Sequence, residues 1–213
     1  EPNSSKFHKP IIMENNSKNQ LKSIAVFCAS SEGNDEKIFS ESYRLGKVLA
    51  QKNIKLVFGG SKLGLMGQVA AGILQNGGEV IGVIPDFLKT KEVVHTGLTE
   101  LITTKDMHER KLKMHELSDG FIALPGGFGT FEELFEIVTW GQLGLHQNPI
   151  GLLNINGFYD DLIAMLKTMV RKGLLRKENF DLLLIGEDIE ELLEKMYNFK
   201  PMPVPKWMNK DQT

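Results

Sequence analysis

Short apolar runs recur along the chain, and each pair is separated by enough residues for a helix. The runs are rich in Val, Ile, Leu and Phe and too short to be helices, which is typical of strands buried on both faces of a sheet. They predict strands at residues 23–29, 55–58, 80–84, 101–103, 120–124, 150–153 and 182–185.

Between these runs, apolar residues recur every three or four positions, as they do on one face of a helix. The stripe at Ile38, Leu45 and Leu49 predicts the first helix, and residues 66–73 contain the second. Further helices are predicted at 107–117, 130–143, 159–172 and 189–197. This alternation predicts an α/β fold: a Rossmann-like, doubly wound parallel sheet with helices on both faces. Ligands of such folds bind at the carboxyl ends of the strands.

Both ends of the chain lack this periodicity. Residues 1–22 are rich in Asn, Ser and Lys, which predicts a flexible N-terminal arm. Residues 200–213 contain three prolines that cannot continue a helix, which predicts an extended C-terminal tail. Residues 23–199 are then expected to form a single Rossmann-like nucleotide-binding domain, which the total length of 213 residues allows.

Charge and cysteine content narrow the classes of function. The chain has 25 Lys and Arg against 27 Asp and Glu, so it has no basic excess for a nucleic-acid surface. Its one cysteine, Cys28, cannot form an internal disulfide, which predicts a reducing compartment. No apolar run approaches the ~18 residues of a membrane span. We therefore expect a cytoplasmic protein that binds neither nucleic acid nor a membrane.

Two glycine clusters follow predicted strands. Residues 59–67 read GGSKLGLMG, and residues 125–133 read PGGFGTFEE. The second cluster lacks the third glycine of the dinucleotide fingerprint, and neither cluster ends in the Gly-Lys-Ser/Thr of a P-loop. NAD binding therefore loses support, and ATP hydrolysis of the P-loop type is excluded.

The second cluster combines glycines with the start of a predicted helix. Gly127 and Gly129 allow a ligand to approach the backbone closely, and the amides of a helix that begins at Thr130 attract an anion such as phosphate. Alternatively, Thr130 and Glu133 have the spacing of a capping box, in which each side chain satisfies a backbone amide of the helix terminus. Both interpretations of Glu133 are open at this stage.

Charged residues of both signs accompany this cluster. The adjacent carboxylates of Glu132 and Glu133 would repel a phosphate unless cations compensate them. Arg110 and Lys111 lie near the start of the predicted helix 107–117, where the helix dipole disfavours basic residues. This placement favours a ligand site, with a solvated charged face as the alternative.

Two motifs carry a resemblance to a known family. One is Pro-Gly-Gly-x-Gly-Thr-x-Glu-Glu at residues 125–133, and the other is the Arg-Lys that follows Met-His at residues 107–111. The sequence resembles the LOG-type phosphoribohydrolases, long mislabelled "lysine decarboxylase", from about residue 24 to residue 199. Supporting stretches lie at 27–31, 64–67, 139–144 and 149–154. The chain departs from the family pattern at Ala29 and Ser61, where many members have glycine.

This resemblance implies hydrolysis of the N-glycosidic bond of a nucleoside 5′-monophosphate, such as a cytokinin riboside monophosphate or AMP, to free base and ribose 5-phosphate. It implies a homodimer and no cofactor. Arg110 and Glu133 are implied as the catalytic pair. The implied substrate-binding residues are Glu92, Lys111, Gly126, Gly127, Phe128, Gly129, Thr130, Phe131, Glu132 and Thr139.

Other functions are weighed against this one. A pyridoxal-dependent decarboxylase needs a Schiff-base lysine and an acidic partner for the ring nitrogen, and the sequence presents no such set. A non-catalytic carrier of a nucleotide or of the molybdenum cofactor is the alternative, because one fold supports unrelated functions. Cys28 is predicted to be a small core residue. The histidines show no metal-ligand spacing, so no metal is predicted.

Overall fold

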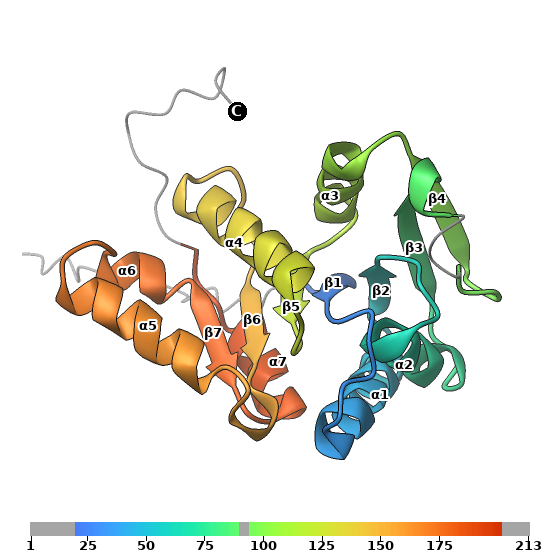
Figure 1. The fold of residues 1–213 in the computed structure, drawn as a ribbon, viewed down its shortest axis with the longest axis horizontal. Coiled ribbons are helices and arrows are strands. Elements are labelled where there is room, and N and C mark those ends of the chain that lie inside the picture. Colours follow the sequence, from blue (N-terminus) through green and yellow to red (C-terminus); the bar gives the residue numbers. More distant parts are fainter. Residues whose placement is uncertain (1–19, 90–93, 202–213) are drawn as a thin grey trace, which may run out of the picture.

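A parallel sheet of seven strands runs through the middle of the molecule (Figure 1). The computed structural model describes residues 20–89 and 94–201. The strands are β1 (Ser23–Phe27), β2 (Lys55–Phe58), β3 (Val80–Pro85), β4 (Glu100–Thr104), β5 (Gly120–Ala123), β6 (Ile150–Leu153) and β7 (Leu183–Gly186). Their order is β4-β3-β2-β1-β5-β6-β7, and every pairing is parallel. The predicted fold class is confirmed.

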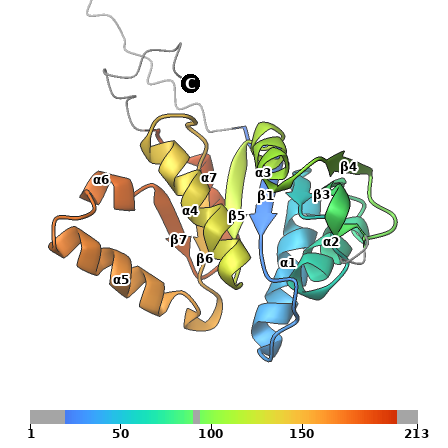
Figure 2. The same ribbon diagram turned by 45° about the horizontal axis from the view of Figure 1, so that its top comes forward.

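Helices cover both faces of this sheet (Figures 1 and 2). One face packs against α1 (Glu36–Gln51), α2 (Gly64–Leu74) and α7 (Ile189–Tyr197). The other face packs against α3 (Met107–Glu116), α4 (Phe128–Gln142) and α5 (Asp160–Arg171). Alternate residues of β1 enter the two cores, Ile24 with the first set of helices and Ala25 with the second. Burial on both faces explains why the strands are continuous apolar runs.

The direction of winding reverses at β1. From β1 the chain builds β2, β3 and β4 toward one edge, and it then returns to place β5, β6 and β7 on the other side of β1. The loops that follow β1 and β5 therefore diverge and leave a crevice at the carboxyl ends of these strands. In Figure 1 this is the region where β5 meets α4, beside β1.

Several element boundaries differ from the sequence prediction. Strand β1 ends at Phe27 rather than at residue 29, and α4 begins at Phe128 rather than at residue 130. The short helix α6 (Lys177–Phe180) and the 3-10 turns Asp86–Leu88 and Ile155–Gly157 were not predicted, because such short elements carry no helical period. Within the described residues, none of the helices has the length and apolar character needed to span a membrane.

The predicted arm and tail lie mostly outside the described residues, which begin at 20 and end at 201. The last residues of the predicted arm belong to the fold. Leu21 is 6% exposed in the core, and the amide of Lys22 donates a hydrogen bond of 2.9 Å to Oδ2 of Asp119. The folded domain therefore begins before residue 23.

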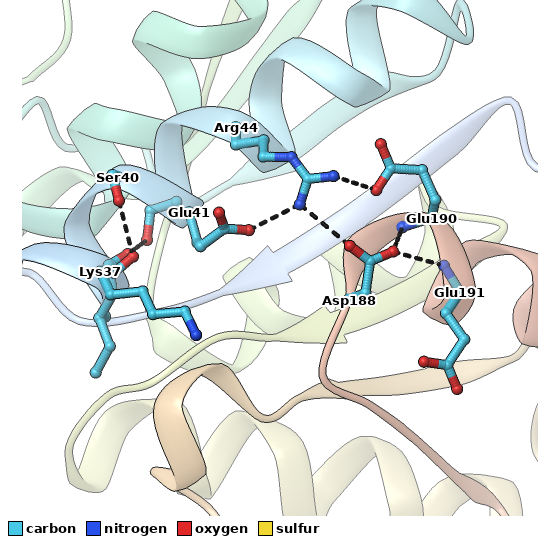
Figure 3. Close-up of polar contacts among 9 residues, drawn as sticks. Lys37, Ser40, Glu41, Arg44, Asp188, Glu190 and Glu191 are labelled. Atoms are coloured by element: carbon cyan, nitrogen blue, oxygen red, sulfur yellow. Dashed lines mark hydrogen bonds and ion pairs between the residues drawn. The ribbon is translucent and has the colours of Figure 1, made fainter.

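A group of charged side chains joins α1 to α7 (Figure 3). The Arg44 guanidinium contacts Glu41 at 3.0 Å, Asp188 at 3.3 Å and Glu190 at 2.5 Å. Asp188 also caps α7 by accepting hydrogen bonds from the amides of Glu190 and Glu191. The hydrogen bond that Arg44 donates to Glu41 is the largest cause that raises the pKa of Arg44. This group orients the two helices but is too exposed to contribute much stability.

A pair of histidines lies between α3, α4 and β5. The ring of His115 stacks on Phe121, with centroids 5.7 Å apart, and lies 5.3 Å from the ring of His146. Nε2 of His146 lies 2.8 Å from the carbonyl oxygen of Ile137, and Nδ1 accepts a hydrogen bond from the amide of Asn148. This pattern requires the neutral imidazole with its proton on Nε2. Burial lowers the pKa of both histidines.

These contacts predict a loss of stability on acidification. Because the pKa of His146 is lower in the folded chain than in the unfolded chain, the unfolded state binds more protons below about pH 6.5. We expect the urea midpoint of the wild type, relative to that of His146→Gln, to fall as the pH decreases from about 7.5 to 5.5. The exposed His108 provides the control His108→Gln, which should keep the wild-type slope. Equal slopes for wild type and His146→Gln would contradict this assignment.

Candidate active site

A cavity of about 400 Å³ lies at the carboxyl ends of β1 and β5, where the strand order reverses. Residues 28–31 of the loop after β1 line the cavity, and so does Gly59, which directly follows β2. Helices α3 and α4 supply the charged residues of the walls. The cavity is therefore built from the segments that the doubly wound fold places at its ligand-binding edge.

The amino end of α4 forms one wall. Gly127 is the N-cap residue and makes no side-chain capping bond, and Phe128 is the first residue of the helix. The amide of Phe131 bonds to the carbonyl of Gly127, so the amides of residues 128–130 have no partner within the helix. Apart from the neighbouring backbone, a Cβ atom on Gly127 or Gly129 would meet no atom of the described residues within 4 Å. This space allows a ligand to approach the first amides of the helix.

This geometry excludes the capping box. Thr130 is the third residue of α4 and not its N-cap, so it cannot cap the amide of Glu133. Its side chain is buried against Gly126, where a Cβ atom would lie 2.0 Å from Oγ1 of Thr130. Gly126 thus leaves room for the Thr130 side chain in the first turn, and the helix starts two positions earlier than the sequence pattern predicts.

Arg110 enters the cavity from α3. The residue is only 6% exposed. Nη2 donates a hydrogen bond of 3.3 Å to the carbonyl oxygen of Gly59, and Nη1 lies 3.7 Å from Sδ of Met107. Nε is buried and has no hydrogen-bond partner among the described residues. The guanidinium is therefore held by uncharged groups and keeps donor capacity for a ligand.

Glu133 lies on α4 and lines the same cavity. Its burial raises its pKa to about 7, the nearby charge of Arg110 opposes that shift, and the carboxylate of Glu132 adds to it. A carboxyl group that titrates near neutrality in a cavity is suited to acid–base or electrostatic work. The structure thus brings the predicted catalytic pair into one cavity.

Lys111 has a different environment from Arg110. Its Nζ lies 2.5 Å from Oε1 of Glu132 and 3.1 Å from Oε1 of Glu136, and it does not line the cavity. Burial lowers the pKa of Lys111, but the hydrogen bonds to the two carboxylates outweigh burial and raise it overall. Lys111 therefore ties α3 to α4 beside the cavity.

The remaining predicted substrate-binding residues divide into three groups. Thr130 and Glu132 line the cavity together with residues 127–129, and Phe128 is 97% exposed at its rim. Gly126, Phe131 and Thr139 do not line it. Glu92 lies outside the described residues.

The cavity also contains residues that the sequence analysis did not assign to the site. Its apolar lining includes Met66, Leu88, Met107 and Met114. Single methionines and leucines carry no motif, and only their position beside strand ends could have indicated them. Cys28 also lines the cavity, and burial raises the pKa of its thiol well above the usual range, so it is not a nucleophile.

A buried tyrosine contacts the start of the loop between β5 and α4. The hydroxyl of Tyr159 donates a hydrogen bond of 2.6 Å to the carbonyl oxygen of Leu124, directly before the glycine cluster. The amide of Tyr159 is held in turn by Oδ1 of Asn154, 2.7 Å away. This chain of contacts fixes the start of the loop against the end of β6.

A larger hollow of about 600 Å³ lies beyond the carboxyl end of α4. Its lining includes Leu143, His146, Leu174 and Arg176, and none of the predicted site residues that the structure describes belongs to it. Volume alone would select this hollow. The buried Arg110, the half-buried Glu133 and the first amides of α4 instead identify the smaller cavity as the candidate active site.

Comparison with known proteins bears on this site. A family profile described as "Possible lysine decarboxylase" matches residues 66–196, which include both motifs. The cytokinin riboside 5′-monophosphate phosphoribohydrolase LOG2 of Arabidopsis thaliana is 39% identical over 184 residues, which cover 86% of each chain. LOG1 of the same plant, of the same description, is 41% identical over 182 residues, which cover 85% of each chain.

Solved structures share the fold at lower identity. The molybdenum cofactor binding protein of Rippkaea orientalis has a TM-score of 0.62 and 23% identity, covering 82% of this chain and 94% of that one. The Moco carrier protein of Chlamydomonas reinhardtii has a TM-score of 0.60 and 20% identity, with the same coverage. These likenesses show the fold alone. On the profile match and the identity to its curated relatives, the chain belongs to the LOG family of phosphoribohydrolases.

Proposed function

We propose that the protein hydrolyses the N-glycosidic bond of a nucleoside 5′-monophosphate and releases the free base and ribose 5-phosphate. The observation that carries the proposal is the placing of the buried Arg110 and the half-buried Glu133 in one cavity, next to the first amides of α4. The descriptions of the curated relatives, as cytokinin riboside 5′-monophosphate phosphoribohydrolases, support it.

The phosphate is proposed to bind at the amino end of α4. The amides of residues 128–130 and the positive end of the helix dipole favour an anion there. Binding energy from the phosphate then fixes the ribose beside Glu133. Glu132 and Thr130 line the cavity close to this point and are proposed as further contacts.

Lys111, Phe131, Gly126 and Thr139 have less support as direct contacts. Lys111 is occupied by Glu132 and Glu136, so its proposed influence on the substrate passes through Glu132. The other three lie outside the lining of the cavity. Gly126 and Phe131 flank the phosphate site in sequence, and we propose that they shape the loop.

Glu133 is proposed to stabilise positive charge on the sugar. Breaking a ribosyl C–N bond gives the ribose oxocarbenium character, which a nearby carboxylate stabilises while it orients the attacking water. The ionised form of Glu133 performs both tasks. The water supplies a hydroxyl group to the anomeric carbon, and the base leaves with the bonding electron pair and gains a proton.

Arg110 is proposed to stabilise the departing base. An arginine guanidinium is a poor proton donor, so electrostatic stabilisation is favoured over general-acid catalysis. The unpartnered Nε supplies a donor for this purpose.

Two alternatives are less well supported. In the part of the cavity that the described residues form, no lysine is present to make a Schiff base with pyridoxal phosphate. A non-catalytic carrier of a nucleotide or of the molybdenum cofactor shares the fold but has no need of a buried arginine and a carboxyl group together. Incubation with AMP and chromatographic detection of adenine separates an enzyme from a carrier.

The proposal includes a homodimer in the cytoplasm. Large apolar side chains are exposed on the two helices that carry the catalytic pair: Leu112 on α3, and Phe128 and Phe135 on α4. Burial of these side chains against a second copy would remove apolar area from water. The free thiol of Cys28 fits a reducing compartment.

Replacing the proposed catalytic carboxylate tests the assignment directly. We expect Glu133→Gln to lower kcat for adenine release from AMP by at least about 10³-fold, because the neutral amide cannot stabilise the sugar cation. Glu178→Gln, at an exposed carboxylate of α6 that does not line the cavity, is the control and should keep most activity. The circular dichroism of both variants should match that of the wild type. Turnover near the wild-type value in Glu133→Gln would refute the assignment.

The pH profile provides a second test. Because burial raises the pKa of Glu133 to about 7, the ionised form is lost below that pH, and kcat/KM should fall about tenfold per pH unit there. Above about pH 7 the profile should level off. Since the charge of Glu132 raises the pKa of Glu133, Glu132→Gln should move the midpoint to lower pH. Activity that increases on acidification would show that the protonated form is the active one.

The identity of the base is tested with a panel of nucleoside monophosphates. Met66, Met107 and Met114 give the cavity an apolar, adaptable lining. We expect the monophosphate of isopentenyl-adenosine to have a KM about tenfold or more below that of AMP, since each buried methylene contributes ~0.8 kcal/mol. Nucleosides that lack the 5′-phosphate should be poor substrates. Equal KM values for the two monophosphates would contradict a cytokinin preference.

A further inference from the structure

The loop that follows β2 lies directly against the side chain of Arg110. Gly59 is the first residue after β2 and is buried. Its carbonyl oxygen accepts the hydrogen bond from Nη2 of Arg110, although the two residues are 51 positions apart in the sequence. The backbone after β2 therefore contacts the guanidinium of a residue on α3.

A side chain at position 59 would occupy the place of this guanidinium. A Cβ atom on Gly59 would lie 2.1 Å from Nη2 and 3.3 Å from Cζ of Arg110, and 3.0 Å from Sδ of Met66. Separations this short force a neighbouring atom to move. The φ angle of Gly59 is not positive, so the backbone conformation alone does not require glycine.

At the other glycines of residues 59–67, a side chain is disfavoured for different reasons. Gly60 and Gly64 adopt positive φ angles, of 82° and 57°. A Cβ atom on Gly67 would lie 2.0 Å from the carbonyl oxygen of Lys62, which is a backbone clash. Gly59 differs because the Cβ atom would collide with the far end of a flexible side chain, and that side chain belongs to the proposed site.

We propose that Gly59 is a positioning residue for Arg110. Its carbonyl oxygen binds the guanidinium, and its lack of a side chain leaves the space that the guanidinium fills in the cavity that Glu133 also lines. Because Gly59 is uncharged, it does not neutralise the positive charge of Arg110, which stays available to the substrate. The proposal rests on the proposed function insofar as it assigns Arg110 to the departing base.

The substitution Gly59→Ala tests the proposal. Because the displaced atoms belong to a flexible side chain, we expect the variant to fold, with a measurable but small decrease in melting temperature relative to the wild type. A guanidinium shifted by about 1 Å should lower kcat for adenine release from AMP by roughly 10²-fold. KM should change by less than about threefold, because the phosphate site at α4 is untouched. Gly141→Ala, within α4 and away from the cavity, is the control and should keep wild-type kcat.

A double-mutant cycle distinguishes positioning from a general structural role. If Gly59 acts through Arg110, adding Gly59→Ala to Arg110→Ala should cause no further loss of kcat. The melting temperature provides a second readout, because any cost of the alanine should disappear once Arg110 no longer fills the space. Additive effects of the two substitutions on both kcat and melting temperature would overturn the proposal.

The double-mutant cycle still tests the proposal if the wild type is inactive on AMP or if Gly59→Ala does not fold. If wild-type protein releases no base from AMP, the proposed function fails, while the melting temperatures still test the contact between Gly59 and Arg110. If Gly59→Ala does not fold, the double variant with Arg110→Ala decides. Folding of the double variant supports the steric contact, and failure of both variants to fold shows a backbone requirement and overturns the positioning role.

Discussion

Arg110 and Glu133 are withdrawn from water in the same cavity, and this is the constraint on which the rest of the site depends. Burial of a charged group costs hydration free energy, which only opposite charges or hydrogen bonds can offset. Here the cost is only partly offset. Arg110 has a carbonyl and a thioether as partners, and burial is the main cause that raises the pKa of Glu133 to about 7. A site in this condition favours a ligand that completes the missing interactions.

The surrounding fold holds this unfavourable arrangement in place from several directions. Helix α3 follows the edge strand β4, and α4 follows the central strand β5, so the two residues are carried by elements that are distant in the sheet. Lys111 joins the helices through Glu132 and Glu136, and Tyr159 holds the end of β5 through the carbonyl oxygen of Leu124. Both sets of contacts limit how far the two residues of the proposed catalytic pair can separate.

The sequence pattern was sufficient for the layers of the fold but not for the details of the site. Continuous apolar strands predict a covered parallel sheet, and the glycine motif predicts where α4 begins to within two residues. The capping-box spacing at Thr130 misplaced that start, because the N-cap residue is Gly127, which has no side chain that could reveal a cap in the sequence. The contact between Gly59 and Arg110 and the raised pKa of Glu133 depend on residues far apart in the chain, which the local pattern does not contain.

The same burial that disfavours the ionised form of Glu133 would make its charge effective in the proposed reaction. In water, a carboxylate gains little from a nearby positive charge because solvent screens the interaction. In the cavity the screening is weaker, so in the proposed mechanism a developing positive charge on ribose interacts strongly with the carboxylate, while the neutral ground state gains no such interaction. Arg110 opposes the effect of burial on the pKa of Glu133, which keeps a useful fraction ionised near neutral pH. An exposed carboxylate would ionise more readily, but it would stabilise a positive charge on the sugar less. Burial of Glu133 thus lowers its ionised fraction and strengthens the interaction that its ionised form can make.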